Sequence, residues 1–207
     1  MNPNTPVRLA VFASGEGSNL RNIYQRIHDG ELKNVELALV VSNNSRSGAL
    51  EVARAADIPS RHLSTRTHVD LAKAMLDVLA EFRVNLIVLA GYMKLLPNEV
   101  VEAYAGRILN IHPALLPEFG GAEMYGLRVH EAVLAAHRKV SGATVHLVTS
   151  NFDEGPIVMQ QTCEVRDDDT AQSLQDRVQK VEYDLYPKAI AKVAVNMIER
   201  GSGTTTL

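Results

Sequence analysis

Cysteine is almost absent from this sequence. Cys163 is the only one among 207 residues, which excludes an intramolecular disulfide framework and any zinc site built from several cysteines. The histidines do not show the His-Glu-x-x-His spacing of a helical zinc site, so we expect no metal. A single thiol is typical of a reducing compartment, and we expect the protein to be cytoplasmic.

The sequence also lacks a basic excess and long apolar runs. Its 21 Lys and Arg residues face 24 Asp and Glu residues, for a formal charge of -3, and no basic cluster is interleaved with aromatic residues. A nucleic-acid partner is therefore not expected. No run approaches the roughly 20 apolar residues of a membrane span, and the first residues do not resemble a secretion signal. Small molecules are the expected partners, and a homodimer is left open.

What is present is an ordinary globular composition, with 46% hydrophobic and 22% charged residues. This length predicts one domain over 1–207, with a frayed tail at about 200–207. Short runs rich in Val, Ile and Leu alternate with segments of helical period, such as those after Ser18 and Thr67. This alternation predicts an α/β, Rossmann-like fold, a mostly parallel sheet with helices on both faces. The three runs are VRLAVFAS at 7–14, VELALVVS at 35–42 and NLIVLAG at 85–91.

The pattern changes beyond residue 105. RILNIH, ATVHLVT and PIVMQQTCEV predict three more strands, with hairpin-like or mixed pairing toward one end of the sheet. A last helix is expected to start near Asp169 or Thr170 and to bend or restart around Pro187.

A glycine-containing loop, SGEGSNL at 14–20, follows the first predicted strand. Leu20 stands where a dinucleotide fingerprint has its third glycine, and the Gly-Lys-Ser/Thr of a P-loop is missing. Backbone N–H groups at such a strand-to-helix junction favour one terminal phosphate. The alternative is that the glycines only make the turn and that Ser18 or Asn19 caps the helix.

Asn110 and His112 interrupt an otherwise apolar predicted strand. Because side chains alternate along a strand, both project to one face, while Leu109 and Ile111 point to the other. Pro113 ends the strand, which places His112 near its carboxyl end, where open α/β sheets bind ligands.

An amide and an imidazole in this position suit acyl transfer to an amine. Attack on a carbonyl creates an oxyanion, which needs a hydrogen-bond donor, and a proton that must be moved near neutral pH. A carboxylate would fix the histidine tautomer, and both Asp153 and Glu154 are placed to supply it. The alternative is a hydrogen-bonded structural histidine, the role expected for His146.

Four segments, SGEGSN, LAGYMKLLP, ILNIHPALLP and FDEGP, together resemble the phosphoribosylglycinamide formyltransferase family of purine synthesis. The resemblance runs from about residue 7 to 195. Its most specific part is the run N-x-H-P-x-L-L-P, followed some forty residues later by D-x-G-P. It implies transfer of a formyl group from 10-formyltetrahydrofolate to the amine of glycinamide ribonucleotide.

The resemblance also implies residue roles. Asn110 and His112 match the groups that stabilise the tetrahedral intermediate, and Asp153 matches the carboxylate that raises the histidine pKa, which selects it over Glu154. Glu182 matches a contact to the glycinamide portion of the substrate. The remaining matches are Gly17, Ser18 and Asn19 for the ribose phosphate, and Met93, Lys94, Leu95, Leu96 and Asn110 for the folate.

Some segments depart from the family pattern. The segment FGGAEMYGLRVH replaces a shorter loop, so Arg128 receives no folate role, although His130 falls at a family histidine. Neither Arg66 nor His68 matches securely the basic folate contact expected near them.

Related activities are the alternatives. A formyltetrahydrofolate deformylase uses water as the acceptor and methionyl-tRNA formyltransferase uses a charged tRNA, and both are expected to carry additional domains. A non-catalytic phosphosugar-binding module is the alternative from another functional class.

Overall fold

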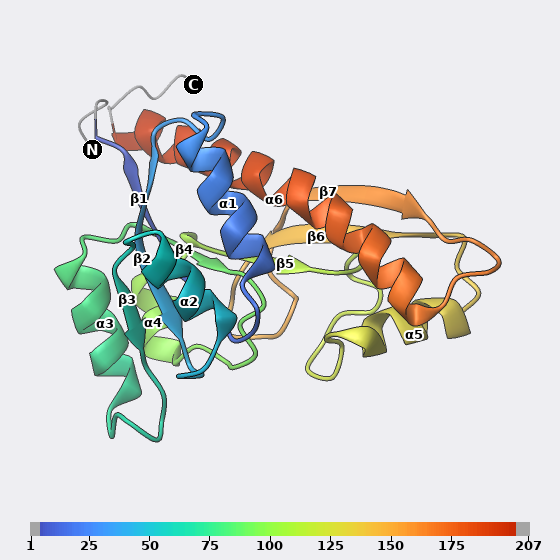
Figure 1. The fold of residues 1–207 in the computed structure, drawn as a ribbon, viewed down its shortest axis with the longest axis horizontal. Helices are drawn as coiled ribbons and strands as arrows, with labels where there is room; N and C mark the ends of the chain where they lie inside the picture. Colours follow the sequence, from blue (N-terminus) through green and yellow to red (C-terminus); the bar gives the residue numbers. More distant parts are fainter. Residues whose placement is uncertain (1–4, 202–207) are drawn as a thin grey trace. The chain divides into compact units, whose positions relative to one another are not determined.

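Strands and helices alternate along the first two thirds of the chain in a computed structural model that describes residues 5–201 (Figure 1). The strands are β1 (Val7–Phe12), β2 (Val35–Ser42), β3 (Ser60–His62), β4 (Leu86–Leu89), β5 (Ile108–His112), β6 (Val140–Leu147) and β7 (Ile157–Glu164). The helices are α1 (Ser18–His28), α2 (Gly48–Ala55), α3 (Leu71–Glu81), α4 (Asn98–Ala103), α5 (Leu127–Ala135) and α6 (Ala171–Gly201).

The strands follow the order β3-β2-β1-β4-β5-β6-β7 in a mixed sheet. Strand β1 pairs in parallel with β2 and β4, and β2 pairs in parallel with β3. The pairs β5–β6 and β6–β7 are antiparallel. The predicted α/β class, with mixed pairing toward the C-terminal end, is therefore confirmed.

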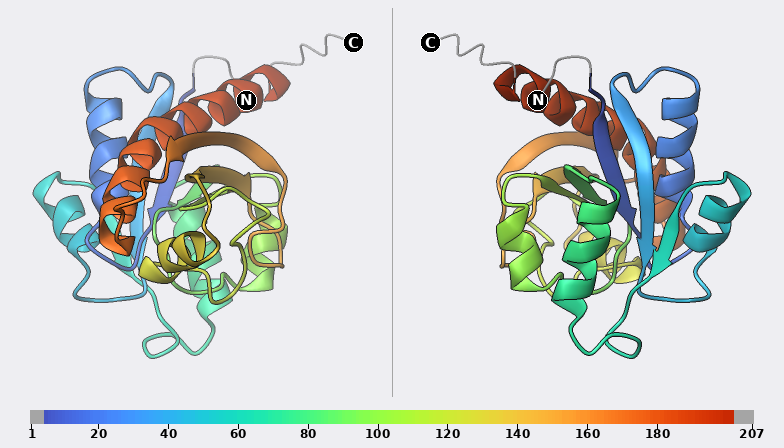
Figure 2. Two further views of the ribbon diagram at one scale, coloured as in Figure 1. Left: turned by 90° about the vertical axis from the view of Figure 1, so that its right-hand side faces the viewer. Right: turned by 90° about the vertical axis from the view of Figure 1, so that its left-hand side faces the viewer.

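The chain divides into two compact units, and the first comprises residues 5–108 and 190–201 of the described chain. Helices α1 and α2 cover one face of its parallel strands, and α3 and α4 cover the other (Figures 1 and 2). Strands β1 and β4 are buried almost throughout, as expected for parallel strands covered on both faces. Their runs of Val, Leu, Ile and Ala are therefore apolar without alternation.

The second unit comprises residues 109–189. Strand β6 is closely approached at two places that require glycine. A Cβ at Gly142 would lie 2.1 Å from the Gln161 carbonyl oxygen on β7, and one at Gly155, in the loop before β7, would lie 1.7 Å from the Leu147 carbonyl oxygen. The part of α6 in this unit buries an apolar stripe, and the Tyr186 hydroxyl donates a hydrogen bond to the Leu109 carbonyl at 3.1 Å. The buried stripe consists of Leu174, Val178, Val181 and Leu185.

The main predicted strands and helices are confirmed, with some differences at the ends and in short elements. Strand β3 has the sequence Ser-Arg-His, which carries no apolar pattern, and its existence depends on pairing with β2. Helix α6 continues through Pro187 and extends to Gly201, so it does not restart at the proline. The predicted fraying at about 200–207 stays a prediction. Residues 202–207 lie outside the described residues, and the single-domain interpretation also stays a prediction.

Candidate active site

Strand β5 places its side chains as the alternation predicted. Leu109 and Ile111 are buried in the core, and the strand ends at His112, which is 4% exposed. The antiparallel register sets Asn110 opposite His146 and His112 opposite Thr144 on β6. Two polar side chains of β5 therefore face two polar side chains of its neighbour.

Asp153 joins this cluster from the loop between β6 and β7. Its Oδ2 lies 3.5 Å from His112 Nδ1, and its Oδ1 lies 3.4 Å from Nε2 of His146. The Gly121 N–H donates a hydrogen bond to Oδ2 at 2.9 Å. The structure thus brings Asn110, His112 and Asp153 into one cluster within the second unit. Glu154 instead accepts a hydrogen bond from the exposed Asn151 at 2.7 Å.

The other ring nitrogen of His112 also faces an oxygen. Nε2 lies 2.7 Å from the Phe119 carbonyl, an acceptor, so this nitrogen carries a hydrogen. Phe119 and Asp153 both have left-handed backbone, each with φ 55. This conformation is rare for a residue as bulky as Phe and more common for Asp, and non-glycine residues held in it cluster at functional sites. Both residues supply an oxygen to His112.

Burial and charge act against each other on these groups. Burial lowers the pKa of His112, although the Asp153 carboxylate and the Phe119 carbonyl both act to raise it. The carboxylate therefore acts in the expected direction, but the net shift is downward. Burial raises the pKa of Asp153, yet His146, the Gly121 N–H and His112 together hold it below its usual value. The carboxyl group is thus ionised at neutral pH.

No site role was assigned from the sequence to two histidines near this cluster, His146 and His130. His146 has the expected hydrogen bond, from its Nδ1 to the Leu147 carbonyl at 3.0 Å, but its Nε2 lies 3.1 Å from the Asn110 amide nitrogen. His130 on α5 is 1% exposed, and burial together with nearby His112 lowers its pKa to about 4. The hairpin register would have revealed His146, because it pairs directly with Asn110.

The glycine loop after β1 takes the form of a helix start. Gly17 occupies the N-cap position of α1 with left-handed backbone (φ 76), and a Cβ there would lie 2.8 Å from the Ala49 Cα. Because the N-cap residue has no side chain, the prediction that Ser18 or Asn19 caps the helix is wrong. Both lie in the first turn of α1, whose N–H groups point out of the amino end of the helix. This geometry suits an anion.

The segment Met93–Leu96 in the same unit is tied to the glycine loop by Ser14. The Ser14 N–H donates to the Gly91 carbonyl at 3.1 Å, and the Met93 N–H donates to the Ser14 hydroxyl at 2.8 Å. The Met93 and Leu95 side chains are 50% and 57% exposed, whereas Leu96 is buried. Lys94 is exposed. Two exposed apolar side chains in one short segment offer surface for a flat ring.

The other residues considered from the sequence are spread over several elements. Glu182 is half-buried on α6 in the second unit. The exposed Arg128 guanidinium lies over the Tyr125 ring, 5.2 Å from its centroid. Arg66 is exposed, and His68 contacts the Thr67 hydroxyl at 2.9 Å.

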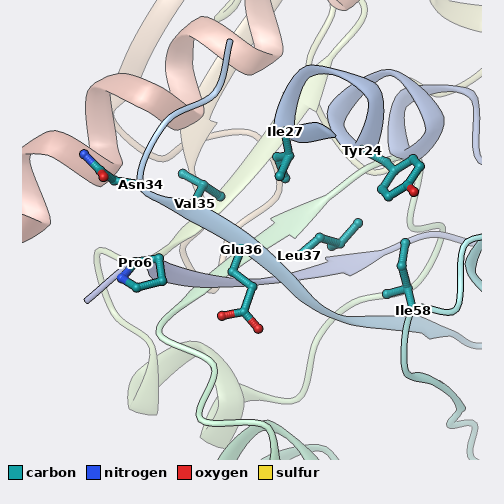
Figure 3. Close-up of a pocket in the computed structure, with 8 residues that line it drawn as sticks. All are labelled: Pro6, Tyr24, Ile27, Asn34, Val35, Glu36, Leu37 and Ile58. Carbon is teal, nitrogen blue, oxygen red and sulfur yellow. The ribbon is translucent and has the colours of Figure 1, made fainter. Parts of the chain in front are cut away.

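An open depression of about 560 Å³ lies elsewhere in the first unit (Figure 3). Pro6 and Asn34, in its lining, directly precede β1 and β2, so it lies at the amino ends of these strands. Open α/β sheets bind ligands at the carboxyl ends, and none of the predicted site residues lines this depression. The lining residues are Pro6, Tyr24, Ile27, Asn34, Val35, Glu36, Leu37 and Ile58.

Residues 5–201 contain neither a metal-binding cluster nor a membrane-spanning helix. Within that range, no group of three or more His, Cys, Asp or Glu side chains is placed to hold a metal ion. No helix in the same range has both the length and the apolar character needed to cross a membrane.

Known proteins are similar to this chain over most of its length. The sequence model of the formyl transferase family matches residues 7–190. Phosphoribosylglycinamide formyltransferase of Arabidopsis thaliana, a chloroplastic protein, is 40% identical over 93% of this chain and 67% of its own length. The Bacillus subtilis enzyme of that name is 36% identical over 90% of this chain and 94% of its own.

Solved structures show the same relationship. The crystal structure of phosphoribosylglycinamide formyltransferase from Brucella melitensis is 39% identical, with a TM-score of 0.84 over 92% of this chain and 96% of that one. A formyltetrahydrofolate deformylase from Pseudomonas syringae has a TM-score of 0.81 at 26% identity, over 91% of this chain and 61% of that one. The chain therefore belongs to the formyltransferase family, among the phosphoribosylglycinamide formyltransferases.

Proposed function

We propose that this protein transfers a formyl group from 10-formyltetrahydrofolate to the amine of glycinamide ribonucleotide in purine biosynthesis. The observation that carries the proposal is the cluster of the Asn110 amide, the buried His112 imidazole and the ionised Asp153 carboxylate, in which Asp153 contacts His112 and is linked to Asn110 through His146. These are the groups that acyl transfer to an amine requires. Membership of the phosphoribosylglycinamide formyltransferases supports the same choice of acceptor.

In the proposed reaction, the substrate amine attacks the formyl carbon on N10 of the folate. The C–N bond that forms creates a tetrahedral intermediate with an oxyanion, to which Asn110 Nδ2 and a His112 N–H donate. A proton leaves the new ammonium and reaches N10 as the old C–N bond breaks, so no oxidant or reductant is needed. Asp153 favours the protonated imidazole and holds its orientation.

The loop before α5 affects which nitrogen of His112 can act. The Phe119 carbonyl lies 2.7 Å from Nε2 and occupies the position that an oxyanion accepting from Nε2 would take. Donation from Nε2 therefore requires this carbonyl to move aside. Hydrogen bonds in active sites without substrate often differ from those made during reaction.

The other predicted residues have binding roles in this proposal. Gly17, Ser18 and Asn19 hold the ribose phosphate, supported by the N–H groups at the start of α1. Met93, Lys94, Leu95 and Leu96 contact the folate together with Asn110, supported by the exposed side chains of Met93 and Leu95. Glu182 contacts the glycinamide portion, as the family resemblance implies. We place the reaction in the cytoplasm because the single cysteine fits a reducing compartment.

A hydrolytic alternative has one observation in its favour. The similarity in fold to the Pseudomonas syringae formyltetrahydrofolate deformylase extends over 91% of this chain. The same cluster could then direct water, and not an amine, to the formyl carbon.

One assay separates these possibilities. Purified protein is mixed with 10-formyltetrahydrofolate, with and without glycinamide ribonucleotide, and the deformylated folate is followed by absorbance. We expect turnover only with both substrates, and we expect it to be nearly abolished in the His112→Ala variant. Turnover without the acceptor would support the deformylase. Binding of both substrates with no turnover would support a non-catalytic module.

A further inference from the structure

His146 and Asn110 face each other across the antiparallel pair β5 and β6. The imidazole is 2% exposed, and its Nε2 lies 3.1 Å from the Asn110 amide nitrogen. Its other nitrogen, Nδ1, lies 3.0 Å from the Leu147 carbonyl oxygen. Both ring nitrogens therefore have a partner within the second unit.

These partners select one tautomer of the ring. The Leu147 carbonyl can only accept, so Nδ1 carries the hydrogen and Nε2 of the neutral ring has a free lone pair. That lone pair accepts a hydrogen from Asn110 Nδ2. If the amide turned by half a revolution, its Oδ1 would face the lone pair and the hydrogen bond would be lost.

We propose that His146 is a positioning residue that fixes the orientation of the Asn110 side-chain amide. One Nδ2 hydrogen is held by the ring, and the second hydrogen and Oδ1 remain available to the reacting groups. The inference rests on the proposed formyl transfer, in which Asn110 donates to the oxyanion. A donor already oriented before the reaction stabilises the developing charge without reorganisation.

The contact of His146 with Asp153 competes with this role, because a hydrogen bond from His146 to that carboxylate contributes to the lowered pKa of Asp153. Nε2 is 3.4 Å from Asp153 Oδ1, and it can donate to that oxygen only if it is protonated. A protonated Nε2 could no longer accept from Asn110. The carboxylate contact to His112 through Oδ2 leaves Oδ1 as the oxygen nearer His146. Only the neutral ring therefore holds the amide.

The tautomer can be measured without any catalysis. Long-range ¹H–¹⁵N spectra of the ¹⁵N-labelled protein near pH 8, assigned with a His146→Gln variant, report which nitrogen of each neutral imidazole carries the hydrogen. We expect Nδ1 of His146 to be protonated and Nε2 to be bare. A neutral ring with the hydrogen on Nε2 would overturn the proposal.

The link to Asn110 is tested by a double-mutant cycle in the formyl-transfer assay. We expect His146→Leu to lower kcat about 10- to 100-fold with smaller changes in both KM values, because a misoriented amide weakens transition-state stabilisation. In an Asn110→Ala background the same change should cost less than about 3-fold, since its target is gone. His146→Gln, whose side-chain oxygen can replace the Nε2 acceptor, should stay within about 5-fold of the wild type.

Controls separate this role from a structural one. His137→Asn alters an exposed histidine of the same unit and should leave kcat unchanged. Equal losses from His146→Leu in both backgrounds, or an unchanged kcat, would refute positioning through Asn110. If His146→Leu fails to fold by circular dichroism, the Gln variant and the tautomer spectrum still decide. If the wild type shows no formyl transfer at all, the proposed function fails, while the spectrum still tests the Asn110 contact.

Discussion

The two compact units present their candidate site residues in different ways. In the first unit the glycine loop offers backbone N–H groups at the start of α1, and Met93 and Leu95 offer exposed apolar surface. In the second unit, His112 and His146 are almost fully buried. Their ring nitrogens contact the side chains of Asn110 and Asp153 and main-chain oxygens. One unit uses main chain and open surface, whereas the other uses enclosed side chains.

This difference predicts different consequences of mutation. A backbone site tolerates changes of side chain but requires glycine where a Cβ would collide or where φ is positive. A buried polar cluster requires each partner, because a polar group left without one in low dielectric is costly. Damage to the first kind of site should therefore appear mainly in KM, and damage to the second mainly in kcat.

The largest expected effect is that of Asp153→Asn, which keeps the shape of the side chain and removes its charge. We expect kcat to fall about 1,000-fold, with both KM values within about 5-fold, because the carboxylate acts on charge that develops in the transition state. Steady-state kinetics with each substrate varied would measure this. The matched control is Glu154→Gln, which alters the neighbouring side chain bound by Asn151 and should leave kcat unchanged. A loss confined to KM would contradict the comparison of the two units.

The next effect concerns the stability of the second unit in acid. Burial lowers the folded-state pKa of His130 to about 4 from an ordinary 6.5, and its Nδ1 has no hydrogen-bond partner among residues 5–201. The unfolded chain therefore binds a proton first as the pH falls. The contribution to stability is full above pH 6.5 and is lost as the pH falls toward 4, by about 3 kcal/mol at most.

His130→Leu should reduce this acid sensitivity. Urea unfolding at pH 8 and pH 4.5 should give a smaller difference in the free energy of unfolding for the variant than for the wild type. His137→Asn, at an exposed position, should retain the wild-type difference. The interpretation fails if the two variants show the same pH dependence.

The smallest expected effect distinguishes two glycines of the backbone site. Gly17→Ala meets the Ala49 Cα at 2.8 Å and a positive φ, whereas a Cβ at Gly15 would meet nothing within 4 Å. We expect Gly17→Ala to destabilise the protein by about 2 kcal/mol and to raise the KM for glycinamide ribonucleotide about 10-fold. Gly15→Ala should change the stability and this KM by less than about half of these amounts. Thermal unfolding and steady-state kinetics would measure the pair, and equal effects would argue against a backbone-defined site.

Much of the fold could be predicted from the sequence because the longer parallel strands are apolar over most of their length. VRLAVF and LIVL are buried on both faces, so their composition alone marks them as strands. Strand β3 could not be predicted in this way, because Ser-Arg-His is only half-buried and pairs at the margin of the sheet. Helix α6 passes through Pro187 although proline removes a backbone donor, a case in which tertiary packing outweighs local preference.

The candidate site, like the fold, could be predicted only in part. Alternation along β5 placed Asn110 and His112 on one face, and the family motif selected Asp153 over Glu154, a choice that agrees with the contacts of both carboxylates. The role of His146 could not be predicted, since its contact with Asn110 depends on the register of β5 against β6. Register depends on the hydrophobic pattern of both strands and on the connection between them, and here that connection is long and contains α5.

The sequence by itself determined the α/β class, the strand that carries Asn110 and His112, and the family. These depend on local periodicity and on motifs, which are properties of short stretches of chain. The tertiary structure alone decided which groups meet: the Phe119 carbonyl at His112, the Gly121 N–H at Asp153, and the imidazole of His146 at Asn110. These partners are 7, 32 and 36 residues apart in the chain. They meet because the antiparallel pair β5 and β6 and the loops around it bury several polar groups together. Buried polar groups need hydrogen-bond partners, and here they find them in one another.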